Sequence, residues 1–240
     1  MGEKCSRRKT VMGQIVLHIL CEGQTEERFV QTVLSPYLRR FNIVTKTIVL
    51  TTNRRSGCVG GAISFEQLKN ELRLVIAQNR KDGYHTHYYS MMVDYYKLPT
   101  DYPDVGECAQ IHDPYLAIQC LEQSIREAVD CGSFIPYIQL HEFEALVLCG
   151  LPLLINEYPE ARRGIEQLQQ QLEQLNNEPE KVNQGEDTAP SKRLIKAFEG
   201  KYRYNKPQVG VQITSSVGID ELKKRCPHFG QWIETLEQLQ

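Results

Sequence analysis

The sequence lacks any long hydrophobic run, and this absence limits the kind of protein that it encodes. No apolar stretch approaches the roughly 18 residues that a membrane helix needs. The 240 residues are nevertheless 41% hydrophobic, which is enough for the core of one large domain or of a core domain with an appendage. We therefore expect a protein that is independent of the membrane and cytoplasmic.

The sequence also lacks an excess of one charge and any familiar cysteine pattern. The formal net charge is −2, so a polyanion site must be a local patch rather than a basic coat. The eight cysteines include no Cys-x-x-Cys pair, and we expect reduced thiols, as is usual in the cytosol. Cys226 and His228 have one residue between them, which is more typical of a packed helix than of a zinc site.

A strand followed by a helix opens the folded part of the chain. Residues 1–11 are polar and basic, and we expect them to be a disordered extension. The apolar run Ile15–Leu20 is long enough for one buried strand, and helical spacing follows from Thr25. Glu22 therefore lies where a strand ends and a helix begins, which is where open α/β sheets bind ligands.

Alternating strand and helix patterns continue to about residue 150. Further strands are predicted at residues 41–50, 87–94 and 134–140, and helices at 65–79 and 114–131. Ser64 and Gln67 form a capping-box pattern before the first helix, and Asp113 with Pro114 marks the start of the second. The expected fold is an α/β class, mainly parallel sheet flanked by helices, because βαβ units place parallel strands side by side.

Acidic residues follow three of the predicted strands. Glu22 ends the first, Asp94 ends the third, and Glu142 and Glu144 follow the fourth. The carboxyl ends of parallel strands meet at one edge, so we expect these acids to share a site. Carboxylates held close repel one another unless they share a proton or a cation, and Mg²⁺ or Mn²⁺ suits such oxygen ligands. The alternative for Glu22 alone is a helix cap or a pair with an arginine.

The composition changes after Gly150, where the chain becomes rich in glutamine and glutamate. We expect residues 151–240 to form a helical C-terminal portion that packs on the core at 12–150. Thr188 and Ser191 suit a helix N-cap, and Lys192 then stands in the first turn, where a cation opposes the helix dipole. Either an anion, such as a phosphate or the acid cluster, lies near this lysine, or the helix is merely capped.

Five motifs in order resemble those of a bacterial family catalogued as domain of unknown function 4276. They are CEGQTEE, VDYYKLPTDYP, FIPYIQLHEFEALV, DTAPSKRL and CPHFGQWIETL, and they span nearly the whole chain from Met12. CEGQTEERF also resembles the Glu-Gly-x-x-acid signature of Toprim domains, which topoisomerases, primases and OLD nucleases share. The resemblance implies a Toprim-like core over residues 12–150 and an AAA- or ABC-type ATPase partner in phage defence.

The Toprim resemblance assigns roles to individual residues. Glu22 takes the place of the metal ligand or general acid/base, Glu26 that of the second acid, and Asp94 that of the first aspartate in the Asp-x-Asp pair. Tyr96 stands where the second aspartate belongs. This departure puts the usual metal set in doubt, and three further acids are candidates to complete it: Asp101, Glu142 and Glu144.

Two functions of different classes follow from these residues. The first is a Mg²⁺-dependent nuclease that acts on DNA or RNA through Glu22, Asp94 and Glu26, with Lys192 as a phosphate contact. The second is a catalytically silent Toprim-like module that binds an ATPase or nucleic acid. Tyr96 favours the second function, whereas the acids at three strand ends favour the first.

Overall fold

A parallel sheet forms the centre of the computed structural model, which describes residues 13–50, 63–96, 98–182, 188–198, 200 and 204–240. The expected extension at residues 1–11 lies outside this set. The five strands are β1 (Ile15–Cys21), β2 (Ile43–Val49), β3 (Thr86–Asp94), β4 (Phe134–Ile135) and β5 (Ile138–Gln139). Their order is β2-β1-β3-β4, β5 also pairs with β3, and all four pairings are parallel. The predicted α/β class is confirmed.

Helices connect the strands and make up the C-terminal part. The first five are α1 (Gln24–Phe29), α2 (Ser35–Leu38), α3 (Phe65–Asn79), α4 (Val105–Cys108) and α5 (Pro114–Val129). The later helices are α6 (Glu144–Val147), α7 (Leu151–Glu157), α8 (Arg162–Glu173), α9 (Pro190–Ala197), α10 (Val211–Val217), α11 (Ile219–Arg225) and α12 (Pro227–Glu237). Two π-helical turns complete the path near the site, η1 (Val30–Leu34) between α1 and α2 and η6 (Lys206–Gly210) before α10.

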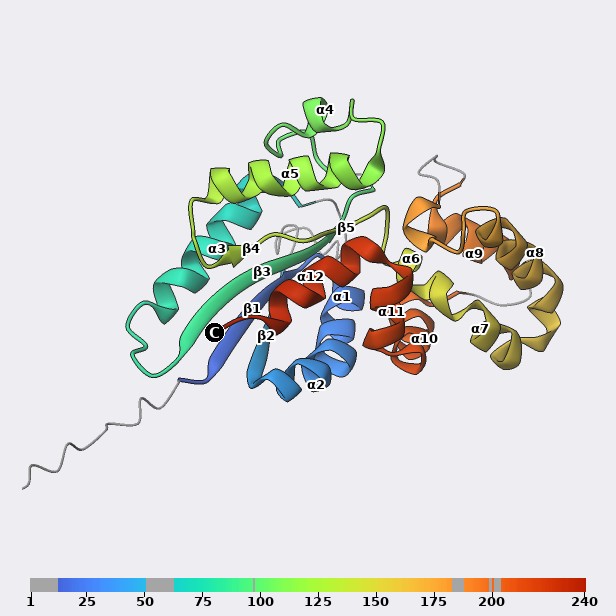
Figure 1. The fold of residues 1–240 in the computed structure, drawn as a ribbon, viewed down its shortest axis with the longest axis horizontal. Helices are drawn as coiled ribbons and strands as arrows, with labels where there is room; N and C mark the ends of the chain where they lie inside the picture. Colours follow the sequence, from blue (N-terminus) through green and yellow to red (C-terminus); the bar gives the residue numbers. More distant parts are fainter. Residues whose placement is uncertain (1–12, 51–62, 97, 183–187, 199, 201–203) are drawn as a thin grey trace, which may run out of the picture.

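Helices cover both faces of the sheet. α3 and α5 lie on one face, whereas α1, α2 and α12 lie on the other (Figure 1). The side chains of β1 alternate between two hydrophobic clusters: Leu17 and Ile19 belong to one with Phe29, and Leu20 belongs to the other with Leu68. Such burial on both sides is typical of parallel sheets and explains why β1 is apolar at every position except His18.

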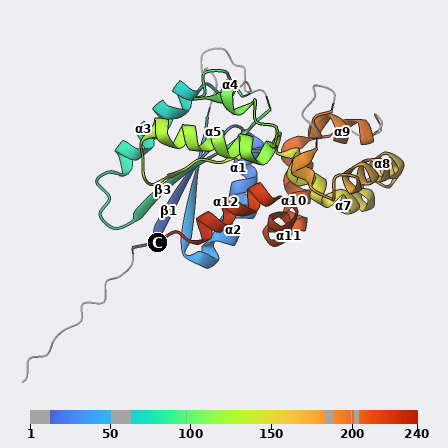
Figure 2. The same ribbon diagram turned by 45° about the horizontal axis from the view of Figure 1, so that its top comes forward.

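The C-terminal helices share the first of these clusters. α7, α8 and α9 group together beside one end of the sheet, while α12 runs back along the face that α1 and α2 also cover (Figure 2). Trp232 of α12 stacks on Tyr137, with ring centroids 4.2 Å apart, and its indole N–H donates to Ser90 of β3 at 3.0 Å. Residues 151–240 therefore contribute directly to the packing of the sheet.

Local capping signals in the sequence are confirmed. Ser64 accepts from the N–H of Gln67 at 3.2 Å, and the Gln67 side chain accepts from the N–H of Ser64 at 3.1 Å, so the predicted capping box starts α3. Asp113 accepts from the N–H groups of the first turn of α5, directly before Pro114. These starts are predictable because capping depends on residues only three positions apart.

Two expectations, about the fourth strand and about the cysteines, are wrong. The single strand expected at residues 134–140 is divided into β4 and β5, because Pro136 between them has no N–H for the ladder. The thiols are not all reduced: Cys108 of α4 and Cys120 of α5 form a disulfide. The four free cysteines among the described residues are Cys21, Cys131, Cys149 and Cys226.

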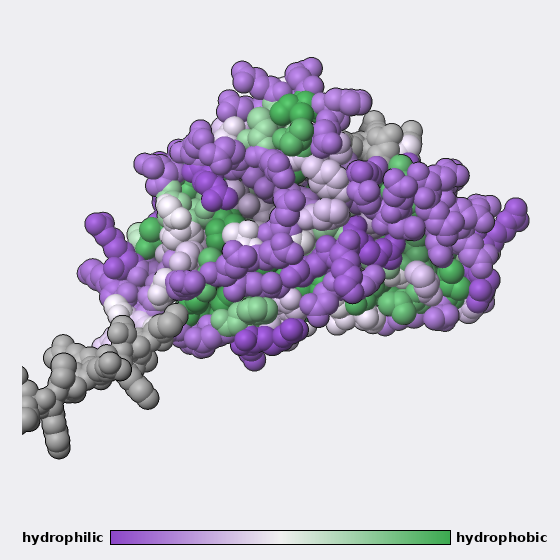
Figure 3. All heavy atoms as spheres, in the orientation of Figure 1, coloured by the Kyte–Doolittle hydropathy of each residue, from purple (hydrophilic) through white to green (hydrophobic). Residues whose placement is uncertain are grey.

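The surface is mainly hydrophilic on the side shown in the space-filling view, where hydrophobic residues form small, separate groups (Figure 3). Among the described residues, no helix combines the length and apolar character needed to cross a membrane.

Candidate functional site

The carboxyl ends of β1 and β3 bring the first two predicted acids together. Glu22 directly follows β1, and its N–H donates to the carbonyl of Met92 in β3 at 3.1 Å. Its side-chain Oε2 accepts from the N–H of Asp94 at 2.8 Å. The central pairing of β1 with β3 therefore places Glu22 beside Asp94, as the sequence predicts.

A half-buried lysine links Asp94 to two more acids. The Lys206 Nζ lies 3.1 Å from Asp94 Oδ2, 3.1 Å from Glu144 Oε2 and 3.9 Å from Glu26 Oε1. The other Asp94 oxygen, Oδ1, accepts from the N–H of Phe143 at 2.9 Å. We call Glu22, Glu26, Asp94 and Glu144, together with Lys206, the acid cluster.

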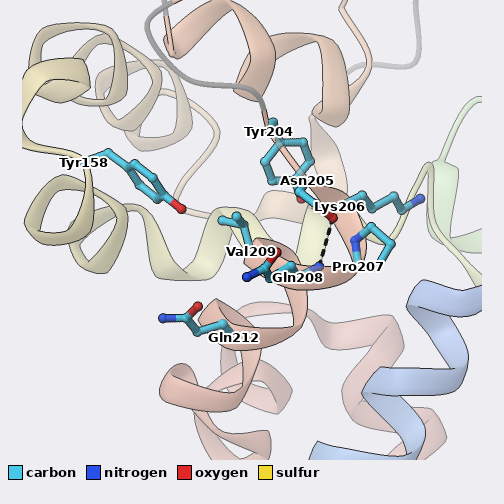
Figure 4. Close-up of a pocket in the computed structure, with 8 residues that line it drawn as sticks. All are labelled: Tyr158, Tyr204, Asn205, Lys206, Pro207, Gln208, Val209 and Gln212. Carbon is cyan, nitrogen blue, oxygen red and sulfur yellow. Dashed lines mark hydrogen bonds between the residues drawn. The ribbon is translucent and has the colours of Figure 1, made fainter.

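Lys206 is the functional residue that the sequence analysis missed. It opens η6, whose N-cap Asn205 accepts from the N–H of Gln208 at 3.3 Å. A cation at a helix start opposes the dipole and indicates a nearby anion, the same signal that was noted at Lys192. In Figure 4, the Lys206 side chain extends away from Tyr158 and from the hollow that this segment lines.

That hollow has a volume of about 720 Å³ and lies beside the acid cluster, with Lys206 on its border. Its wall is polar and aromatic: Tyr158 and Tyr204 stand on one side, and the amides of Gln208 and Gln212 on another (Figure 4). Aromatic rings and amides are groups that stack on and hydrogen-bond to bases. The hollow is thus a candidate for the part of the site that holds a substrate.

Burial and mutual repulsion keep protons on the carboxylates of the cluster. Burial, followed by the charge of Asp94, raises the pKa of Glu22 to about 8 and that of Glu26 to about 6. Burial raises the pKa of Glu144 to about 7, against the Lys206 ammonium, which lowers it. One ammonium faces four carboxylates, so the cluster takes up further positive charge as protons or as another cation.

Lys206 remains protonated in the acid cluster. Burial works to lower its pKa, but the charges of Asp94, Glu144 and Glu26 outweigh this effect and hold the pKa well above its usual value. Burial raises the pKa of Asp94 despite the opposing effect of Lys206. Lys206 therefore stays an ammonium, and it is the carboxylates that exchange protons.

Glu142 lies next to this cluster but has a different partner. Its two oxygens accept from the N–H and the hydroxyl of Ser191, at 2.9 and 3.1 Å, at the start of α9. The expectation that Thr188 or Ser191 is the N-cap is wrong: Ala189 is at that position, without a side-chain cap bond. Glu142, from another part of the chain, accepts the hydrogen bond of a free N–H in the first turn of α9. The sequence around α9 therefore does not reveal this cap.

Two other predicted residues lie elsewhere. Asp101 is exposed, and its Oδ2 accepts from the N–H of Phe65 at the start of α3 at 2.9 Å. Lys192 is exposed on α9, and its neighbour Arg193 donates to the carbonyl of Thr188 at 2.8 Å. Among the residues that the structure describes, the lysine that contacts the acids is Lys206.

Tyr96, which stands in place of the second aspartate, shares a small cavity with Glu22 and Asp94. The cavity has a volume of about 10 Å³ and is also lined by Tyr102, so it has room for about one water molecule. The N–H of Tyr96 donates to the carbonyl of His141 at 2.8 Å. The backbone at this position is thus held close to the acid cluster.

The raised carboxyl pKa values predict a stability that falls as the pH rises. Glu22 titrates at about 4.5 when unfolded and at about 8 when folded, so the folded chain holds a proton that is lost as the pH rises through 8. His18 and His141 have pKa values lowered to about 4, so they make the free energy of unfolding rise with pH. That rise ends at about pH 6.5, the pKa of an unfolded histidine. Between about pH 6.5 and 8.5 in EDTA, we expect the free energy of unfolding to fall by about 1 kcal/mol.

Urea denaturation at the two pH values, followed by circular dichroism, measures this change. The control is Glu22→Gln, which has no proton to lose at this position and is expected to show a smaller fall. An equal fall in the parent and in Glu22→Gln would show that Glu22 is ionised throughout this pH range.

Comparison with known families gives one match. A family model described as "Domain of unknown function (DUF4276)" matches residues 21–237, which include every residue of the acid cluster. No curated protein and no solved structure matches the chain.

Proposed function

Because the chain belongs to the family described as Domain of unknown function (DUF4276), a description that names no activity, we propose a function from the site itself. The proposal is a Mg²⁺- or Mn²⁺-dependent nuclease that hydrolyses phosphodiester bonds in DNA or RNA. The observation that carries it is the convergence of Glu26, Asp94 and Glu144 on one ammonium, with Glu22 bonded to the N–H of Asp94 beside them, at the ends of parallel strands.

The residues present fit a hard divalent cation. All four acids of the cluster offer oxygen ligands, which Mg²⁺ and Mn²⁺ prefer, and their charge exceeds that of Lys206. Asp94 Oδ2 and Glu144 Oε2 already contact the ammonium. The carboxylates of Glu22 and Glu26 are therefore more available to bind an ion. Such an ion, when bound, supplies Lewis-acid stabilisation of a phosphodiester.

The chain itself supplies proton transfer and positive charge. Before an ion binds, Glu22 has a pKa of about 8. It therefore has one of two roles: it binds the ion as a carboxylate, or, where the other acids hold the ion, it donates a proton to a leaving oxygen near neutral pH. Lys206 borders the hollow and turns a permanent ammonium toward the acids, where it stabilises negative charge on a phosphate bound at the acid cluster. The ATPase partner and the role in phage defence are proposed from the family resemblance.

A cleavage assay tests this function. We expect the purified protein to cut plasmid DNA or single-stranded RNA in the presence of Mn²⁺ or Mg²⁺, and we expect EDTA to abolish the cleavage. Glu22→Gln and Asp94→Asn are expected to lower the rate by at least about 100-fold, since each removes a metal ligand or a proton-transfer group. The matched control is Glu27→Gln, beside Glu26 on α1, because the Glu27 carboxylate bonds to Gln31 at 3.1 Å rather than to the cluster.

The second candidate is a catalytically silent module that binds an ATPase or nucleic acid. Lys206 favours it, because an ammonium amid the acids partly replaces the charge of a metal ion, and Tyr96 favours it because a carboxylate is missing there. Calorimetric titration with Mg²⁺ and Mn²⁺ separates the two functions. No metal binding together with no cleavage, also in the presence of an ATPase partner, would reject the nuclease and leave the silent module.

A further inference from the structure

A second group of side chains, of the types that bind metals, lies at the opposite end of β3. Asp82, in the turn after α3, is followed by His85 and by His87, the second residue of β3. Asp82 Oδ2 lies 2.7 Å from His85 Nδ1 and 3.1 Å from His87 Nε2. His87 and Asp94 are seven positions apart along the strand, roughly 23 Å at 3.3 Å per residue, so this group is separate from the acid cluster.

The turn holds the Asp82 carboxylate in one orientation. Its Oδ1 accepts from the N–H of Tyr84 at 2.9 Å and from the N–H of His85 at 3.3 Å. These two bonds leave Oδ2 facing both imidazoles. The carboxylate oxygen and the two ring nitrogens all lie within 4.8 Å of one another, so they converge on one point without a change in the path of the backbone.

A third histidine supports the group from inside the sheet. His18 of β1 is 3% exposed, and its Nε2 lies 3.0 Å from His87 Nδ1. If the shared proton is bound to His87 Nδ1, then His87 Nε2 is unprotonated and its lone pair faces Asp82. A hydrogen-bond partner behind a ligating imidazole, which sets its tautomer, is a regular feature of metal sites in proteins.

We propose that Asp82, His85 and His87 bind a divalent transition-metal ion of the zinc type. Two imidazole nitrogens with one carboxylate oxygen are the protein ligands of many three-ligand zinc sites, in which water fills the remaining position. The side chains of Asp82 and His85 are 27% and 39% exposed, which gives an ion and its water access from solvent. Mixed nitrogen and oxygen ligands also distinguish this site from the all-oxygen acid cluster, which suits Mg²⁺.

The required movement is small. Tetrahedral zinc with bonds of roughly 2.0–2.1 Å places its ligand atoms about 3.3 Å apart, compared with the 2.7 and 3.1 Å found here. The two imidazole nitrogens lie within 4.8 Å of each other, so they approach by up to roughly 1.5 Å to reach this spacing, which side-chain rotation on a turn and at the start of a strand allows. The competing explanation is a hydrogen-bonded turn in which both imidazoles donate to Asp82 and no ion binds.

Calorimetric titration with Zn²⁺ tests the proposal. The protein is used without an affinity tag, at about pH 7.5, where an ordinary imidazole is neutral, and in a buffer that contains Mg²⁺ to satisfy the acid cluster. We expect one Zn²⁺ to bind, with affinity weakened at least tenfold in Asp82→Asn and in His85→Ala. His18→Phe is expected to bind about 10–100-fold more weakly, because it removes the support behind His87.

Two control variants and a spectroscopic measurement complete the experiment. His112→Ala removes an exposed histidine elsewhere, and Glu22→Gln alters the acid cluster; both are expected to bind Zn²⁺ like the parent. Co²⁺ is expected to give visible absorption of a nitrogen-ligated ion that disappears in His85→Ala, while circular dichroism confirms the fold of each variant. No saturable Zn²⁺ binding, or binding that is equal in the parent, Asp82→Asn and His85→Ala, would overturn the proposal.

Discussion

Lys206→Met is expected to lower the free energy of unfolding by about 3 kcal/mol at about pH 8 in EDTA, the low end of the cost of breaking a buried ion pair. The substitution keeps the length of the side chain and removes the charge that Asp94 and Glu144 contact at 3.1 Å. We use the low end because the Lys206 side chain is 31% exposed and because the acids take up protons in response. Thermal unfolding is expected about 6–12 °C lower, at roughly 2–4 °C per kcal/mol.

Three comparisons make this result specific to the acid cluster. Lys192→Met removes an exposed lysine and is expected to change stability by less than about 0.5 kcal/mol. Asp94→Asn added to Lys206→Met is expected to recover part of the loss, because it neutralises a charge that the lysine no longer balances. Addition of Mg²⁺ is expected to stabilise Lys206→Met more than the parent if the cluster binds a cation. Parent-like stability of Lys206→Met in EDTA would show that the acids are already neutral.

Trp232→Ala is expected to lower the free energy of unfolding by about 3–5 kcal/mol, the usual cost of removing a buried aromatic side chain. Trp232 is 4% exposed, stacks on Tyr137 with an angle of 8° between the rings, and donates to the hydroxyl of Ser90. It joins α12 to the sheet, so its loss leaves a cavity between the C-terminal portion and the core. Urea denaturation followed by circular dichroism measures the effect.

The same helix provides the control. Glu234→Ala changes an exposed residue of α12 and is expected to leave stability within about 0.5 kcal/mol of the parent. Trp232→Phe keeps a ring at the contact and is expected to cost less than Trp232→Ala. A loss below about 1 kcal/mol in Trp232→Ala would mean that the sheet holds together without α12. Trp232 is the only tryptophan in the chain, so its fluorescence reports unfolding of this contact in the parent.

Much of the sheet and four of the five residues of the acid cluster could be named from the sequence. β1 and β3 are short apolar runs, and the acids that follow them meet because parallel strands place their carboxyl ends together. Capping at Ser64 and Asp113 depends on residues within three positions. The sequence therefore predicts that Glu22 and Asp94 lie side by side, without knowledge of the later helices.

The remainder of the site depends on contacts between distant parts of the chain. Lys206 reaches Asp94 from a different helical segment, and Glu142 reaches the first turn of α9 at Ser191. No spacing rule connects such residues, because the return path of the chain is set by packing. The division of the fourth predicted strand has a local cause instead, because Pro136 separates β4 from β5. The prediction failed there because the apolar residues around Pro136 favour one continuous strand.

The late position of Lys206 in the chain affects how the protein forms during synthesis. At 5–20 residues per second, the ribosome adds this lysine roughly 10–40 s after Glu22. A nascent chain that already has β1 and β3 therefore has the acids but not the ammonium that contacts them in the finished protein. Until η6 emerges, these carboxylates must stay protonated or apart. The acids at the strand ends can thus reach their final charge state only after residue 206 has been added.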